Sequence, residues 1–167
     1  MKNIIVGFSC PKKWKPFAWA IMKTLNTSYD HVYMKFHSAT YSRDIIYQAS
    51  SVMVNFMGPD VFDSNNNIVK EFSLSISDDN YIKLMQFCID NAGKPYSIKE
   101  ILGIFLVIIA KRLGKTISNP FKEGTSQFVC STLGSYIIED FANIALPEDY
   151  ETMSPKDLYI LLEKTNG

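Results

Sequence analysis

A chain of 167 residues with 47% hydrophobic and 20% charged side chains is long enough for one domain with a substantial core and too short for two of ordinary size. The 17 basic and 17 acidic side chains cancel, and no long run of like charge occurs, so nothing in the charge pattern indicates binding to nucleic acid or to an anionic membrane. We expect one α+β domain spanning residues 1–167.

The three cysteines argue against a disulfide framework and against a zinc site, because their number is odd and no C-x-x-C pair occurs. We therefore expect a reducing compartment and no metal or cofactor. The apolar run Ile4–Phe8 is too short for the core of a signal peptide. We expect a cytoplasmic or virion-associated protein, and the Asn-, Ile-, Lys- and Tyr-heavy composition is compatible with an AT-rich bacterial or phage genome.

In the first half of the chain, segments rich in Val, Ile, Tyr and Phe predict strands. One helix is predicted between Trp14 and Leu25, where apolar residues recur at intervals of three and four. Residues 58–60 predict a turn, and the Asn-rich stretch 63–67 predicts a longer loop. The predicted strands are Asn3–Ser9, His31–Phe36, Ile45–Ala49, Val52–Met57 and Ile68–Ile76.

The second half of the chain is predicted to be helical. Ser77 is the N-cap of a helix whose apolar period places Cys88 on the buried stripe, so we assign Cys88 to the core. Ser97–Glu100 has the pattern of a capping box and opens the next helix. The last helix is predicted within Ser154–Lys164, with a serine N-cap and a proline at its first position.

The helix that follows the capping box is unusual because Ile101–Ala110 is apolar apart from Gly103. Ten residues are too few to span a bilayer. A helix that is apolar on every side must be covered, and we favour burial beneath neighbouring elements. The alternative is a helix that faces or lines lipid.

A further helix is predicted around Cys130, beginning near Thr125 or Ser126. Cys130 then lies in its first turn, where unpaired N–H groups and the helix dipole favour a thiolate. Gly134, one turn later on the same face, leaves room for a strand to approach. Because a free cysteine among apolar residues is usually a small core residue, a nucleophilic role for Cys130 requires a base and an orienting group elsewhere.

The candidate bases are the two histidines, His31 and His37. His31 lies where a strand begins, next to a loop, whereas His37 follows the end of that strand in a predicted surface loop. If the next strand pairs with the first, the carbonyl oxygen of Gln48 can accept a ring N–H of His31 and fix its tautomer. The structural alternative is a surface histidine and a solvent-facing glutamine.

The order and spacing of five short motifs carry a resemblance to a known family. The motifs are Ser28–Met34, Ile46–Ala49, Gly93–Tyr96, Phe128–Ser131 and Met153–Leu158. With these motifs the chain resembles the circularly permuted branch of the papain-like, NlpC-type cysteine hydrolases, a superfamily that includes lecithin:retinol acyltransferase-like proteins. The histidine precedes the cysteine, as in the permuted members. The resemblance extends over most of the chain, from about Asn26 onward.

The resemblance implies a permuted papain-like fold, in which an antiparallel sheet packs against helices and Cys130 lies at a helix N-terminus. It implies that His31 takes the proton of Cys130, that Gln48 orients His31, and that Tyr96 shapes the substrate or oxyanion site. Two positions depart from the family pattern. Gln48 stands where an acidic residue is frequent and offers no charge to an imidazolium, and Asp30 replaces a small residue.

Three functions fit these residues. The first, which we favour, is a thiol hydrolase that cleaves an amide bond, in peptidoglycan stem peptides or in a related isopeptide or acyl-amide. The second is an acyltransferase or acyl hydrolase acting on lipid, with Ile101–Ala110 as a wall of the lipid site; it needs a membrane association that we do not favour. The third is an inactive module that keeps the scaffold for binding or assembly.

Overall fold

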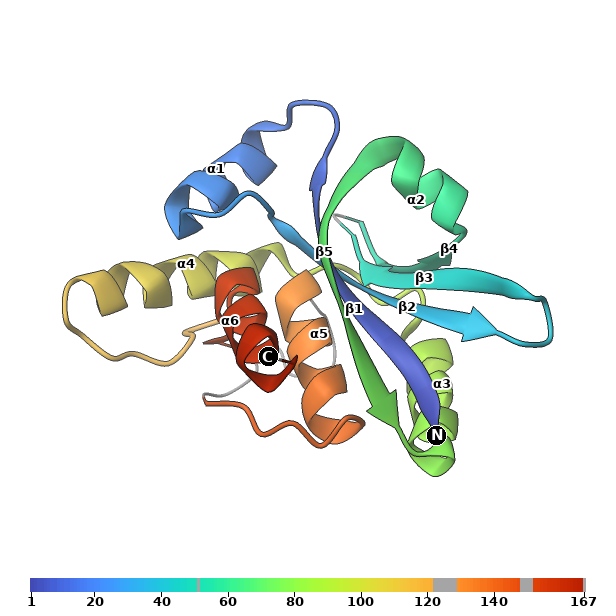
Figure 1. Cartoon of the computed structure of the whole chain (residues 1–167). Coiled ribbons are helices and arrows are strands. Elements are labelled where there is room, and N and C mark those ends of the chain that lie inside the picture. Colours follow the sequence, from blue (N-terminus) through green and yellow to red (C-terminus); the bar gives the residue numbers. More distant parts are fainter. Residues whose placement is uncertain (51, 122–128, 148–151, 167) are drawn as a thin grey trace.

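A five-stranded antiparallel sheet with the strand order β4–β3–β2–β1–β5 runs through the part of the chain that the structure describes (Figure 1). The computed structural model describes residues 1–50, 52–121, 129–147 and 152–166. The strands are β1 (Lys2–Pro11), β2 (His31–Ser38), β3 (Arg43–Ala49), β4 (Val54–Met57) and β5 (Asn66–Ile76). The helices are α1 (Pro16–Leu25), α2 (Pro59–Asn65), α3 (Asp78–Asn91), α4 (Ile98–Arg112), α5 (Cys130–Asp140) and α6 (Pro155–Asn166). The predicted α+β class with an antiparallel sheet is confirmed.

The two faces of the sheet carry different helices because successive side chains of a strand point in opposite directions. On β2, Val32, Met34 and Phe36 join the main core, which contains the buried side of α5. Between them, Tyr33 points to the other face and packs against Phe62 of α2, with ring centroids 4.5 Å apart. Helices α5 and α6 contact each other and cover the first face (Figure 1).

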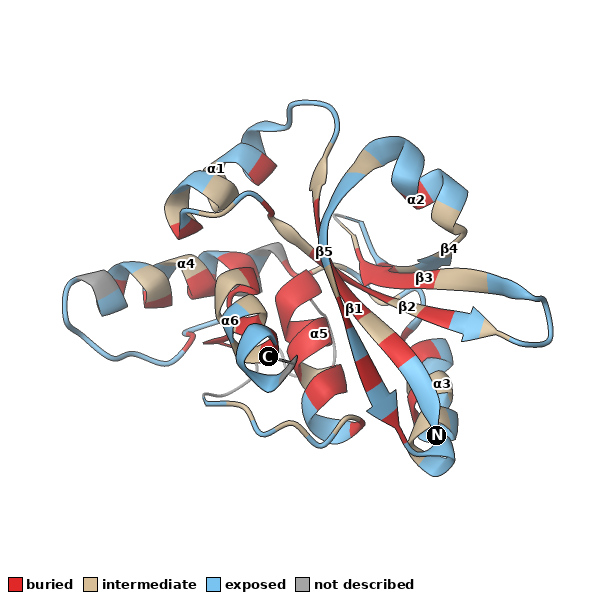
Figure 2. Ribbon diagram, viewed as in Figure 1, coloured by how far each residue is buried: buried red, intermediate tan, exposed pale blue. Residues whose placement is uncertain are grey.

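Helix α5 is the most deeply buried helix in view, with nearly its whole length coloured as buried (Figure 2). It packs closely on β2 because Gly134 has no side chain. A Cβ at that position would lie 3.0 Å from Cγ1 of Val32 and 3.1 Å from Cδ2 of Leu158. The expectation that Gly134 lets a strand approach is confirmed. Cys88 of α3 is fully buried in the same core, as predicted.

Helix α2 replaces the turn and loop that were predicted over residues 58–67. Pro59 occupies its first turn, where a missing N–H costs nothing, and the side chains of Ser64 and Asn65 hydrogen bond to the carbonyl oxygen of Val61. The helix is held by Phe62, which is 1% exposed. A single apolar anchor has no period, so sequence spacing did not reveal this helix. As a result β5 begins at Asn66, two residues earlier than predicted.

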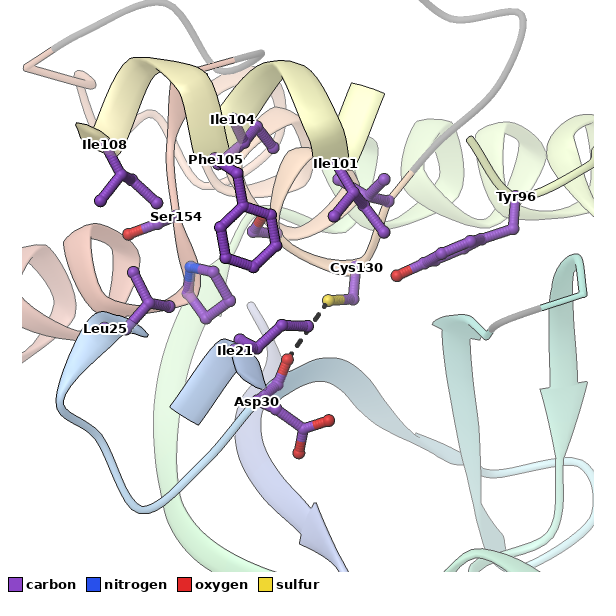
Figure 3. A pocket seen from close by; sticks show the side chains of 13 residues that line it. Ile21, Leu25, Asp30, Tyr96, Ile101, Ile104, Phe105, Ile108, Cys130 and Ser154 are labelled. Carbon is purple, nitrogen blue, oxygen red and sulfur yellow. Dashed lines mark hydrogen bonds between the residues drawn. The ribbon is translucent and has the colours of Figure 1, made fainter. Parts of the chain in front are cut away.

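Helix α4 is buried on one side only, which corrects the expectation that neighbours would cover it all round. Ile101, Ile104 and Val107 are buried, whereas Leu102 and Ile109 on the opposite side are about half exposed (54% and 49%). Within the described residues, no helix combines the length and the apolar character needed to cross a bilayer. Helix α4 instead lies beside the N-terminal end of α5 and reaches the site described next (Figure 3).

Candidate active site around Cys130

Cys130 is the first residue of α5, with Val129 at the N-cap position. The N–H of Val129 donates to Oγ1 of Thr132, 3.1 Å away, so a hydroxyl within the first turn caps this helix start. The helix therefore begins later than predicted, and the expected N-caps Thr125 and Ser126 lie outside the described residues. The later start places the sulfur at the end of the helix, among its unpaired N–H groups.

The thiol of Cys130 is in its protonated form in this site. Its Sγ donates a hydrogen bond to the main-chain oxygen of Asp30, 3.9 Å away (Figure 3). Burial raises the pKa of Cys130 to about 11. The main-chain N–H of Val32 lowers this pKa, whereas the negative charge of Asp30 raises it further. The predicted thiolate is thus wrong for the resting site, because loss of hydration outweighs the helix N-terminus.

His31 is the first residue of β2, on the same side of the strand as Tyr33, and its ring centroid lies 6.2 Å from that of Phe62 in α2. Its Nε2 lies 2.6 Å from Oε1 of Gln48 on the neighbouring strand β3, and the predicted hydrogen bond is present. Burial lowers the pKa of His31 to about 4, although the bond to Gln48 raises it. The imidazole is therefore neutral at neutral pH and able to accept a proton.

The contact with Gln48 determines which ring nitrogen of His31 is free. A carbonyl oxygen can only accept, so Nε2 carries the proton and Nδ1 keeps its lone pair. The orientation of the amide agrees, because its Nε2 donates to Sδ of Met57 at 3.3 Å and to Oδ1 of Asn55 at 3.5 Å. Gln48, 6% exposed, holds the ring as a neutral orienting group.

One cavity of about 240 Å³ brings all four predicted site residues together, since Cys130, His31, Gln48 and Tyr96 line it. The hydroxyl end of Tyr96 points toward the sulfur in Figure 3. Its main-chain N–H donates to the oxygen of Val52, which fixes the Tyr96 segment beside the sheet. The sulfur and the imidazole share this cavity, while the hydrogen bond of the sulfur goes to Asp30 rather than to the ring.

A second, narrower cavity meets the first at Cys130. It is almost entirely apolar, and its free space of about 30 Å³ admits one or two waters. Helix α4 forms one wall and α1 contributes another side (Figure 3). The residues from these two helices are Ile21, Leu25, Ile101, Ile104, Phe105 and Ile108. Cys130 thus lies between a polar and an apolar compartment.

The other histidine does not belong to the site. His37 lies within β2 rather than in the predicted loop, because the strand continues to Ser38. It is exposed, and its Nδ1 lies 2.9 Å from Oδ1 of Asp44. Within the described residues, no group of three His, Cys, Asp or Glu side chains is placed to hold a metal ion.

Sequence reasoning missed two charged residues of the larger cavity, Asp30 and Lys15. Asp30 stood out only as a departure from the family pattern, although a carboxylate directly before a candidate catalytic histidine was a usable signal. Lys15 carried no signal, because it lies among other lysines before α1.

Alkylation tests the neutral state of the thiol. We expect iodoacetamide to modify Cys130 faster than the fully buried Cys88, whose pKa is also raised by burial. The rate at Cys130 should rise with pH toward a midpoint near 11, since the thiolate is the reactive form. Peptide mapping by mass spectrometry measures both sites in one sample. A midpoint below that of a free thiol would contradict the neutral resting state.

The comparisons with known proteins do not indicate a function, so the functional assignment depends on the residues of the site. No model of a known protein family matches this chain, and a search of curated proteins finds no match either.

Proposed function

We propose that this chain is a thiol hydrolase that cleaves an amide bond, with Cys130 as nucleophile, His31 as base and Gln48 as the group that orients the base. One observation carries the proposal: a cysteine at a helix N-terminus and a hydrogen-bonded histidine–glutamine pair line the same cavity. The antiparallel sheet packed on α5 is consistent with a permuted papain-like fold, which we propose for the domain.

In the proposed reaction, Sγ of Cys130 attacks the carbonyl carbon while Nδ1 of His31 accepts the thiol proton. The two transfers occur together, since the resting thiol and imidazole are both neutral. Main-chain N–H groups at the start of α5, including that of Cys130, stabilise the oxyanion. The imidazolium then protonates the leaving amine, and water, deprotonated by His31, releases the acyl group from sulfur.

The attack requires the thiol to exchange its partner. In the resting structure its proton is held by the oxygen of Asp30, so Sγ must turn toward His31 when a carbonyl enters the cavity. In the proposed mechanism this exchange takes place by rotation about the Cα–Cβ bond of Cys130. Substrate binding therefore completes the catalytic arrangement.

Peptidoglycan stem peptides are the first substrates to test, followed by isopeptide-linked dipeptides and N-acyl amides. Incubation with each substrate and mass spectrometry of the products should show one bond cleaved, with a new amine and a new carboxylate. The proposal fails if folded protein cleaves no bond in any of the three classes.

A second candidate, acyl transfer or acyl hydrolysis on lipid, is favoured by the apolar cavity at Cys130. Side chains of α4 that line this cavity include Ile104 and Phe105, and the outer side of the helix exposes Leu102, Leu106 and Ile109. A lipid chain could approach along such a surface. We rank this candidate second because the free space beside the sulfur is too narrow for an acyl chain unless α4 moves.

A liposome sedimentation assay separates the two candidates. For the lipid enzyme we expect vesicle binding that falls strongly when Leu106, which is 44% exposed, is replaced by Asp, and acyl transfer that falls with Phe105→Asp. Lys83→Asp on α3, away from the cavities, is the matched control. Absence of vesicle binding by the wild-type protein would remove this candidate and leave the amide hydrolase.

A further inference from the structure

Asp30 occupies a fixed position between the sheet and the candidate nucleophile. Its main-chain N–H donates to the oxygen of Ser9 at the end of β1, and its main-chain oxygen accepts from Sγ of Cys130. Both ends of the residue are therefore held. The carboxylate points away from the α4 side chains in Figure 3, and Asp30 lines the larger, polar cavity with His31 and Gln48.

The carboxylate of Asp30 lacks a full set of partners. Its Oδ1 is buried and has no hydrogen-bond partner among the residues that the structure describes. Burial raises the pKa of Asp30 to about 6, against the lowering effects of its own main-chain N–H and then of the charge of Lys15, which lines the same cavity. A buried acceptor without a donor destabilises the folded protein, so each such group requires an explanation.

Activation of the thiol does not explain this carboxylate. The negative charge of Asp30 raises the pKa of Cys130, which makes the thiolate harder to form. The orienting position next to His31 is already occupied by Gln48. A cationic donor that enters the cavity with the substrate would pair with the carboxylate of Asp30 and offset its effect on the sulfur.

We propose that Asp30 is the specificity residue of this site and binds a protonated amino group of the substrate, close to the carbonyl that Cys130 attacks. The inference rests on the proposed hydrolase and narrows its substrates to amine-bearing peptides or amides. It disfavours neutral acyl lipids, whose chains would place nothing but carbon against a carboxylate.

Three methanethiosulfonates that share the same reactive group but differ in charge test the inference. The test measures modification of Cys130 and does not depend on catalytic turnover. The reagents are the 2-aminoethyl, methyl and 2-sulfonatoethyl compounds, and each rate at Cys130 is divided by the rate with N-acetylcysteine. At neutral pH we expect the cation to react roughly 10-fold or more faster than the anion after this correction. Asp30→Asn should abolish most of that preference, whereas Lys15→Met should increase it.

An unchanged charge preference in Asp30→Asn would overturn the inference, as would absence of any reaction at Cys130. Labelling needs only a reachable thiol, so it can succeed even if the protein hydrolyses no amide. The role of Asp30 and the hydrolase activity can therefore be rejected independently.

Thermal unfolding supplies a second readout. The raised pKa means that ionised Asp30 lowers stability above about pH 6, so Asp30→Asn should raise the melting temperature at neutral pH and lose this gain near pH 4. A lower melting temperature at neutral pH would show a structural partner and contradict the inference.

Discussion

Replacing Cys130 by alanine is expected to reduce amide hydrolysis by about 1,000-fold or more, because the proposed acyl intermediate forms on its sulfur. Binding should persist, since the cavity and its polar groups remain. The measurement is the initial rate of cleavage on whichever stem peptide or amide the wild-type protein hydrolyses, together with the melting temperature of both proteins.

Cys10→Ser is the matched control for this experiment. Cys10 is a free, partly exposed cysteine at the end of β1, so its replacement removes a thiol without touching Cys130. The control should retain full activity and remain sensitive to iodoacetamide. If Cys130→Ala left every measured function intact, the chain would be a binding or assembly module on this scaffold rather than a hydrolase.

Replacing His31 by alanine is expected to lower the rate by about 100- to 10,000-fold, the usual contribution of a positioned general base. The neutral resting pair makes the base essential, because the thiol, with a pKa raised to about 11, is almost fully protonated at neutral pH. Activity of His31→Ala should recover partly at high pH, where hydroxide replaces the base. His37→Ala, whose ring is exposed and pairs with Asp44, is the matched control and should behave as wild type.

Gln48 offers a sharper test of the same base. Gln48→Leu removes the acceptor for Nε2 and should cost part of the activity through loss of the ring orientation. Gln48→Glu keeps an acceptor and adds a charge that stabilises the imidazolium, so the pKa of His31 should rise from about 4. Because His31 acts as a base only when neutral, the acid limb of the pH–rate profile should then move to higher pH. An acid limb that is identical in wild type and Gln48→Glu would exclude His31 as the base.

The arrangement has a chemical consequence for substrate choice. The sulfur lies where an apolar cavity lined by α4 meets a polar cavity that contains His31 and Gln48, and Asp30 lines both cavities. A substrate that fits both would place an apolar group on one side of its scissile carbonyl and a hydrogen-bonding, cationic group on the other. This description suits an amide of an amino acid better than a phospholipid or a charged polymer.

The sequence alone determined the parts of this protein that depend on local spacing. On the condition that their strands pair side by side, the sequence placed the carbonyl of Gln48 within reach of His31, and both the pairing and the hydrogen bond are present. The helical period assigned Cys88 to the core, and the glycine one turn after Cys130 predicted the close approach of β2. Each of these features depends on the spacing of residues within one helix or within two neighbouring strands.

The sequence also predicted most strands and helices, but it predicted the ends of elements and the short elements less well. Helix α2 depends on Phe62 meeting Tyr33 from a distant strand, and no local pattern predicts that contact. Helix α5 begins at Cys130, where the hydroxyl of Thr132 accepts from the N–H of Val129, a contact that the sequence pattern did not indicate. In both cases a tertiary or short-range polar contact overrode the propensity that the sequence displayed.

Only the tertiary structure decided the charge states in the site. Helix position and neighbouring residues predicted a thiolate, whereas burial leaves Cys130 and His31 neutral and Oδ1 of Asp30 without a partner among the described residues. Loss of hydration is a sum over all atoms packed around a group, including α1 and α4, which are remote from Cys130 in the chain. The sequence thus named Cys130, His31, Gln48 and Tyr96, whereas the packing of distant segments added Asp30 and Lys15 to the cavity and set the protonation of Cys130 and His31.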